Sequence, residues 1–174
     1  MKYLGHGLTI LLVGVLSVGC DDGGDLFSPA VSGKFVGSWD SEANINLALV
    51  GFTQGDISED EGLLELQDPD LTERYLIDLP GDPGVALGIY RVVAFTDRDG
   101  SADYSLGDLP ALGDTCGKYL IYVDDLPESE LPLETWLGDL TGLEEGWNGF
   151  DRQKGVYQDL VYNGFDLYRT GNCP

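Results

Sequence analysis

Basic side chains are scarce in this sequence of 174 residues, which has 9 lysine and arginine residues against 31 aspartate and glutamate residues. The formal net charge at pH 7 is therefore −22. Proteins that bind nucleic acids present clustered basic side chains to the phosphates. The basic residues here are scattered singly from Lys34 to Arg169, and we therefore expect no nucleic-acid partner.

Histidine is rarer still, because His6 is the only one in the chain. It lies in the first nineteen residues, a segment that we expect to be removed. Serine–histidine–aspartate and cysteine–histidine nucleophiles, histidine general bases and histidine-bound zinc all need an imidazole. We therefore expect the exported chain to use none of these chemistries.

The N-terminal segment lacks a hydrophobic run long enough to cross a membrane. Lys2 is followed by a mostly apolar stretch from Leu8 to Val18, and then by Gly19, Cys20 and two aspartates. A membrane span needs about 20 apolar residues, whereas a positive charge before a short apolar run is typical of a signal peptide. We predict a cleaved signal peptide over residues 1–19.

The end of that segment, Leu16-Ser17-Val18-Gly19-Cys20, resembles the lipobox of bacterial lipoproteins. In that family a small residue precedes a cysteine that is lipidated and becomes the new N-terminus. The family usually has leucine three residues before the cysteine, where this chain has Ser17. The resemblance implies that Cys20 carries lipid and anchors the protein to a bacterial membrane, in the cell envelope, facing the periplasm or the cell exterior. An ordinary secretory signal with a chance cysteine is the alternative.

Only three cysteines occur in the chain. If Cys20 carries lipid, Cys116 and Cys173 remain as an even pair in a compartment that permits oxidation. We predict that these two form a structural disulfide that ties the C-terminal strand to the middle of the domain. A redox-active dithiol is the alternative, but it would more naturally show a Cys-x-x-Cys motif, which this sequence lacks.

The remaining chain has the pattern of one β-rich domain over residues 31–174, preceded by a flexible acidic tether over residues 20–30. Hydrophobic residues make up 43% of the sequence, which is enough for one core. Apolar and polar residues alternate in five short segments, which are Phe35 to Trp39, Ile45 to Gly51, Tyr75 to Leu79, Ile89 to Phe95 and Tyr119 to Val123. This alternation and the intervening turn signals predict a mainly β fold, a single antiparallel β-sandwich. One short helix is expected between Glu130 and Leu140, covering an open end.

A short sequence is repeated near the end of the chain. Trp147-Asn148-Gly149-Phe150-Asp151 is followed by Tyr162-Asn163-Gly164-Phe165-Asp166. Because Asn-Gly is a strong turn signal, we predict two similar turns whose aromatic neighbours pack on a sheet. A carbohydrate-binding surface made of exposed Trp147, Tyr162 and Tyr168 is the alternative.

An acidic loop follows the predicted strand that ends at Phe95. Oxygen-bearing side chains recur along it at Asp97, Asp99, Ser101, Asp103 and Asp108. Gly100 permits a sharp turn, and calcium prefers about six to eight oxygen ligands from a tightly curled segment of this kind. We predict that these five residues hold Ca²⁺, and that the ion relieves repulsion between the carboxylates.

The spacing of the acidic loop matches an EF-hand only in part. Asp108 stands where that loop has its closing carboxylate, but the family has glutamate there. Gly100 follows the second acidic position, whereas an EF-hand has its glycine after the third, and no flanking helices are predicted. The string Asp-x-Asp-Gly-x-x-Asp, from Asp97 to Asp103, resembles the calcium loops of β-propellers and other extracellular β modules. A solvated turn that binds no ion is the alternative.

The stretch from Tyr75 to Pro80, the segment Gly88-Ile89-Tyr90-Arg91-Val92-Val93-Ala94-Phe95 and the acidic loop together resemble a known family. They are similar to the transthyretin-like and carboxypeptidase-regulatory-like β-sandwich modules of bacterial surface proteins. The resemblance covers about Thr72 to Asp108, and it implies a sandwich used for adhesion, scaffolding or binding, without catalysis.

Two classes of function therefore remain. We expect a lipid-anchored calcium-binding β-sandwich that is not an enzyme and that binds an unknown protein or glycan partner, including as a subunit of an envelope assembly. The alternative is a glycan hydrolase with paired carboxylates, one of them with a raised pKa. Its candidates have aromatic neighbours, which are Glu134 beside Trp136 and Glu144 or Glu145 beside Trp147.

Overall fold

The computed structural model describes residues 28–39, 44–53, 62–67, 69–101, 103–105, 108, 111–124 and 137–174. Its strands are β1 (Ala30–Val36), β2 (Ile45–Thr53), β3 (Gly62–Leu66), β4 (Arg74–Asp78), β5 (Leu87–Thr96), β6 (Gly113–Asp114), β7 (Lys118–Val123), β8 (Gly146–Asp151), β9 (Gly155–Tyr157), β10 (Val161–Asn163) and β11 (Leu167–Arg169). The prediction of a mainly β fold is confirmed, and four of the five alternating segments form strands. Of the fifth, Phe35 to Trp39, only Phe35 and Val36 lie in a strand, at the end of β1. Within these ranges no helix is long and apolar enough to span a bilayer.

The strands form one curled sheet in which β5 is central. The order along the sheet is β10-β1-β11-β6-β5-β7-β8-β9, while β2 joins β5, β3 joins β2 and β4 joins β1. The longest pairing is antiparallel, between β2 and β5, and runs from Ile45 opposite Thr96 to Thr53 opposite Gly88. Because Thr96 at the end of β5 is paired with Ile45, the start of the acidic loop is held next to the start of β2.

The expectation of a purely antiparallel arrangement is wrong for β1. Its Ala30–Ser32 segment pairs in parallel with β10, and Phe35 and Val36 pair in parallel with β11. From β10 to β11 the chain runs alongside β1 and in the same direction as β1, so both strands pair with it in parallel. On its other side β1 pairs with β4 in the antiparallel sense.

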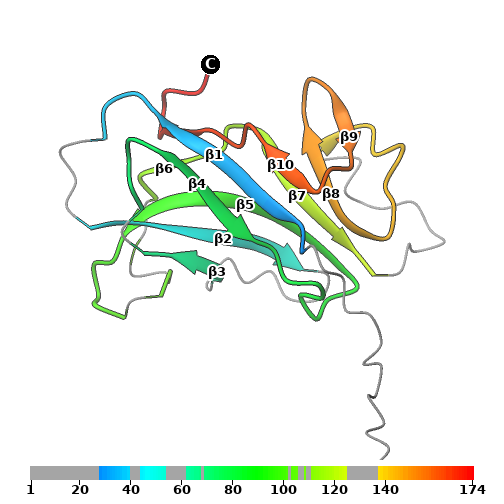
Figure 1. Cartoon of the computed structure of the whole chain (residues 1–174), viewed down its shortest axis with the longest axis horizontal. Coiled ribbons are helices and arrows are strands. Elements are labelled where there is room, and N and C mark those ends of the chain that lie inside the picture. The colour runs from blue at the N-terminus through cyan, green and yellow to red at the C-terminus, as the bar shows by residue number, and fades with distance from the viewer. Residues whose placement is uncertain are drawn as a thin grey trace, which may run out of the picture.

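The main core lies where the curled sheet faces itself. β1 and β4 cross in front of β2 and β5 in Figure 1, and buried side chains from both pairs of strands belong to one cluster with Tyr162 of β10. Its fully buried members include Val31, Leu47, Val92, Leu120 and Phe165. Phe165 lies between β10 and β11, and the other four lie in strands. On β2 and β5 the core residues recur at every second position, so the period of two found in the sequence selects the inward face.

Both faces of β5 are buried, because two further segments cover the outer side of the sheet. After β5 the chain folds back so that Tyr104 packs edge-on against Phe95, with ring centroids 5.2 Å apart. On β7 and β8, Leu140 packs in a cluster with Ile121 and Phe150. Most of the predicted helix, residues 130–136, lies outside the described residues.

The repeated sequence takes two different conformations, so the prediction of two similar turns is wrong for the first copy. Asn148 and Gly149 lie inside β8, opposite Ile121 and Leu120 of β7. In the second copy Asn163 ends β10 and Gly164 has a φ of 78°, which is a turn conformation. The first copy is extended because β8 pairs with β7 on one side and with β9 on the other.

Candidate functional site

The acidic loop begins where β5 ends and is anchored by packing. Tyr104 is buried against Phe95, so the loop folds back over the outer face of β5. Gly100 has a φ of 76°, a left-handed conformation that favours glycine and turns the chain sharply. The chain therefore brings residues from both ends of the loop together.

Three of the five predicted ligands converge in the acidic loop. One carboxylate oxygen from each of Asp97, Asp99 and Asp108 lies within 4.8 Å of the others. Asp99 is exposed, Asp97 is half-buried and Asp108 is fully buried. We call these residues the aspartate cluster, and it opens to solvent on the Asp99 side.

Backbone donors hold Asp108 in place. Its Oδ1 accepts the Arg98 N–H at 2.7 Å, and its Oδ2 accepts the Ser105 N–H at 3.0 Å and the Ser105 hydroxyl at 3.2 Å. A buried carboxylate needs such donors, because burial without them is costly. Asp108 therefore links the first and second halves of the loop.

Hydrogen bonds also orient the two more exposed carboxylates. Asp97 Oδ1 accepts the Gly100 N–H at 2.7 Å, and Asp99 Oδ1 accepts the Ser101 N–H at 3.0 Å. Hydrogen bonds from the hydroxyl and the N–H of Ser101, and then from the Ser105 hydroxyl, lower the pKa of Asp99 below its ordinary value. Asp99 is therefore ionised at neutral pH, as a cation ligand must be.

The other two predicted ligands do not join the cluster. The Ser101 hydroxyl has a single proton, which it shares between Asp99 and the main-chain carbonyl of Asp103, 2.8 Å away. The carboxylate of Asp103 is not one of the three that meet in the aspartate cluster. The converging set is thus Asp97, Asp99 and Asp108, with Ser105 as a supporting residue that the sequence pattern did not single out.

The donor set suits a hard cation. The aspartate cluster offers only oxygen atoms, and each ionised carboxylate has about four lone-pair positions. The hydrogen bonds described above occupy some of these positions and leave others for an ion. Calcium and magnesium take oxygen ligands, and the flexible coordination of calcium suits an irregular loop better than the strict octahedron of magnesium.

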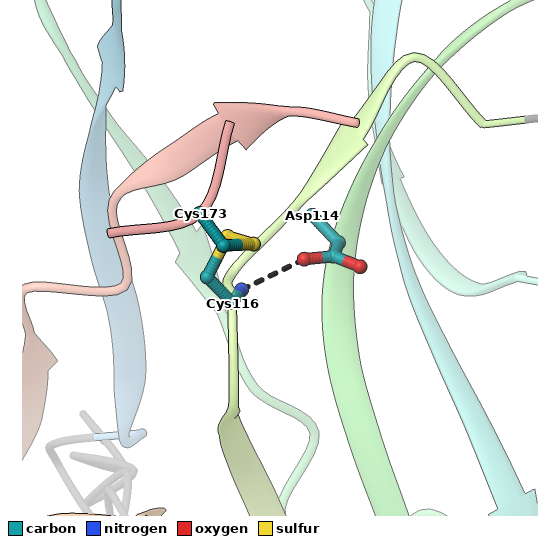
Figure 2. A group of neighbouring side chains, drawn as sticks. All are labelled: Asp114, Cys116 and Cys173. Atoms are coloured by element: carbon teal, nitrogen blue, oxygen red, sulfur yellow. Dashed lines mark hydrogen bonds between the residues drawn. A yellow bond between two sulfur atoms is a disulfide. The ribbon is translucent and has the colours of Figure 1, made fainter. Parts of the chain in front are cut away.

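A second group of possible ligands contains Asp114, Cys116 and Cys173, shown in Figure 2. The two cysteines form a disulfide between residues 57 apart in sequence, with their Cα atoms 5.5 Å apart. This is the predicted pair, and it ties the chain after β11 to the turn before β7. Asp114 Oδ1 accepts the Cys116 N–H at 2.7 Å, and Asp114 also pairs with Arg91 at 3.3 Å. Because the sulfurs are bonded to each other, they are not thiolate ligands, and this group serves as a cross-link.

The residues predicted for the lipid anchor and for the two alternatives, a carbohydrate-binding surface and a glycan hydrolase, differ in exposure, and some lie outside the described residues. Glu144 and Glu145 are exposed, whereas Trp147 and Tyr162 are buried and Tyr168 is half-buried. The proposed exposed carbohydrate platform is therefore wrong for Trp147 and Tyr162, because both lie in the core. Cys20, Glu134 and Trp136 lie outside the described residues.

Comparison of the chain with protein-family models, curated proteins and solved structures finds no match.

Proposed function

We propose that this protein is a lipid-anchored domain of a bacterial cell envelope that binds calcium through Asp97, Asp99 and Asp108. The observation that carries the calcium proposal is the convergence of three carboxylates within 4.8 Å, one of them fully buried. Like charges held so close repel one another, and a divalent cation removes that repulsion. The lipid anchor on Cys20 is supported by the lipobox-like sequence.

The finer fold proposal is a transthyretin-like β-sandwich. Two groups of strands packing across a shared core support it, as does the position of the acidic loop directly after β5. In this proposal the domain has a structural, adhesive or binding role rather than a catalytic one. The exposure of Glu144 and Glu145 favours binding, because a catalytic acid needs an enclosed setting to raise its pKa.

The anchor and the acidic loop would lie at opposite ends of the domain. The chain enters β1 at Pro29, whose carbonyl accepts the Leu79 N–H at 2.7 Å. The neighbouring Pro80 carbonyl accepts the Trp147 indole N–H, and Trp147 belongs to the end where β5 begins. The ten residues of β5 then span about 30 Å before the acidic loop starts. Figure 1 shows the start of β1 and the loop after β5 on opposite sides of the domain.

This arrangement favours a partner that approaches from outside the membrane. A lipid on Cys20 would hold the Pro29 end towards the bilayer, so the aspartate cluster would point away from it. A bound calcium ion would then lie where an extracytoplasmic protein or glycan could reach it. A binding experiment should therefore test whether a partner binds at the acidic loop, on the side of the domain away from the membrane.

Thermal unfolding with and without calcium tests the metal proposal. The chain from Asp21 to Pro174 is unfolded in excess EDTA and in millimolar calcium, beside Asp97→Asn/Asp99→Asn. Extracellular calcium sites bind at about 10⁻⁴ to 10⁻³ M. For a dissociation constant of about 10⁻⁴ M, about 10 mM calcium is about one hundred times that constant and adds about 2.7 kcal/mol to the free energy of unfolding, a shift of several degrees in Tm.

The wild type should shift and the double variant should not. Asp139→Asn is the matched control, because Asp139 is an exposed aspartate that accepts the Thr141 N–H at 2.9 Å outside the aspartate cluster. It should keep the full calcium response. Equal responses in the wild type and the double variant would reject the aspartate cluster as the calcium site.

Mass spectrometry of the membrane fraction tests the anchor. The expected product begins at Cys20 and carries acyl chains, and Cys20→Ser should release the protein from the membrane fraction. A product that starts elsewhere, or that stays in the membrane after Cys20→Ser, would contradict lipidation.

A further inference from the structure

The sequence aromatic-Asn-Gly-Phe-Asp occurs twice, and the two asparagines have opposite surroundings. Asn148 is fully buried inside β8. Its Nδ2 donates to the carbonyls of Glu144 at 2.8 Å and Gly146 at 3.0 Å, and its Oδ1 accepts the Gln158 amide at 2.8 Å. The amide group of Asn148 is thus held on both sides by the fold.

Asn163 is exposed and ends a short strand. Its Nδ2 donates to the Val161 carbonyl two residues earlier, at 2.9 Å. β10 has three residues, and its described ladder is the three-residue pairing with β1. An exposed side chain with one local hydrogen bond changes rotamer at a lower free-energy cost than a buried side chain held on both sides. The Asn163 side chain therefore reaches conformations that Asn148 cannot.

We propose that Asn163 is a site of spontaneous deamidation through reaction with the main-chain nitrogen of Gly164. That nitrogen bonds to Cγ of Asn163, the Cγ–Nδ2 bond breaks, and ammonia leaves with the proton of the Gly164 amide. Water then opens the succinimide ring at either carbonyl and gives aspartate or isoaspartate at position 163. Glycine favours ring closure because it has no Cβ to obstruct the approach, and asparagine is among the chemically labile residues.

The two products have different effects on the fold. Phe165 is fully buried and its N–H donates to the Ser32 carbonyl at 3.1 Å, while the Lys118 ammonium donates to the Gly164 carbonyl. Isoaspartate adds one carbon to the main chain just before these contacts and displaces them. Aspartate leaves the main chain unchanged, adds a negative charge at an exposed position and loses the hydrogen bond that Asn163 donates to the Val161 carbonyl.

Peptide mass spectrometry tests the proposal with Asn148 as the internal control. The folded protein is held at mildly alkaline pH, sampled over time and digested. The peptide containing Asn163 should gain the mass that separates an amide from a carboxyl group, and the peptide containing Asn148 should not. In denaturant both peptides should convert, which shows that the fold protects Asn148. Retention of the Asn163 amide, or equal rates at both positions in the folded protein, would overturn the proposal.

Two variants separate the chemistry from its structural effect. Asn163→Gln should abolish the acidic species that accumulates on anion exchange, because glutamine closes the larger ring slowly. Asn163→Asp supplies the aspartate product alone and should change Tm only slightly, because the hydrogen bond to the Val161 carbonyl that it loses is exposed. The separated isoaspartate form should unfold at a lower temperature than this variant. Equal Tm values for these two forms would contradict the displacement of Phe165.

Discussion

Gly33 in β1 and Asp108 in the acidic loop are both enclosed by the fold, yet different contacts surround them. At Gly33 a Cβ atom would lie 2.0 Å from the carbonyl oxygen of Phe165 and 2.9 Å from the ring of Tyr75. At Asp108 the neighbours are the N–H groups of Arg98 and Ser105. Steric fit therefore decides which side chain the sheet accepts at Gly33, whereas charge and hydrogen bonding stabilise the conformation of the acidic loop. The sheet should be sensitive to side-chain volume, and the loop should be sensitive to ionic conditions.

The largest expected effect comes from removing the cross-link of the sheet. Cys116→Ser/Cys173→Ser opens a loop of 57 residues and should lower the free energy of unfolding by about 4 kcal/mol. The physical reason is the greater entropy of the unfolded chain without the disulfide. Denaturant unfolding measures the change, and the reduced wild-type protein should behave like the variant. A variant as stable as the oxidised wild type would contradict this role.

Gly33→Ala tests whether shape determines the sheet. The added methyl group meets main-chain atoms of Phe165 that cannot rotate away, so we expect a loss of about 3 kcal/mol from overpacking. Gly81→Ala is the matched control, because no atom lies within 4 Å of a Cβ at that position. Thermal unfolding should show a large drop in Tm for the first variant and little change for the second. Similar Tm values would show that β1 adapts to the methyl group.

Asp108→Asn tests whether hydrogen bonding determines the acidic loop. The amide nitrogen takes the place of one carboxylate oxygen and cannot accept a hydrogen bond, so the part-buried N–H of Ser105 or of Arg98 loses its partner at a cost of about 2 kcal/mol. Hydrogen exchange should increase in the loop and stay unchanged in β1. Asp103→Asn is the control within the same loop, because its carboxylate lies outside the aspartate cluster. Equal exchange in both variants would mean that Asp108 does not organise the loop.

The smallest effect is expected from two aspartates that belong to neither region. Hydrogen bonds from Thr72 lower the pKa of Asp70, and hydrogen bonds from Thr141 lower that of Asp139, below the ordinary value of 3.8. Their contribution to stability is present above pH 3.8 and is lost as the pH falls through the lowered folded-state pKa values. Denaturant unfolding of Asp70→Asn/Asp139→Asn should therefore show a slightly smaller acid dependence than the wild type. An unchanged acid dependence would mean that other carboxylates account for it.

Local signals in the sequence were enough to identify five of the strand-forming segments and the main candidates for the site. The alternation of Tyr75, Ile77 and Leu79 matches their burial on one face of β4 and the residue that follows it. Two cysteines left as an even pair indicated the disulfide. These inferences succeed because side-chain period and chemical type are properties of short segments or of composition.

Other features depend on which segments meet in space. Asn148-Gly149 has the composition of a turn, but pairing with β7 and β9 holds it in a strand. The parallel pairing of β1 with β10 and β11 joins segments more than a hundred residues apart, and no local pattern encodes it. The role of Ser105 as a donor to Asp99 and Asp108 likewise becomes visible only after the loop has folded back.

The sequence by itself determined the charge of the chain, its β-rich character and the residue types available for a cation. Tertiary structure decided which of those residues come together. Tyr104 packs on Phe95 and carries the second half of the acidic loop towards Asp97, so that Asp108 is included and Asp103 is not. The reason is that alternation sets the direction of each side chain, whereas convergence requires long-range packing that fixes where the chain returns.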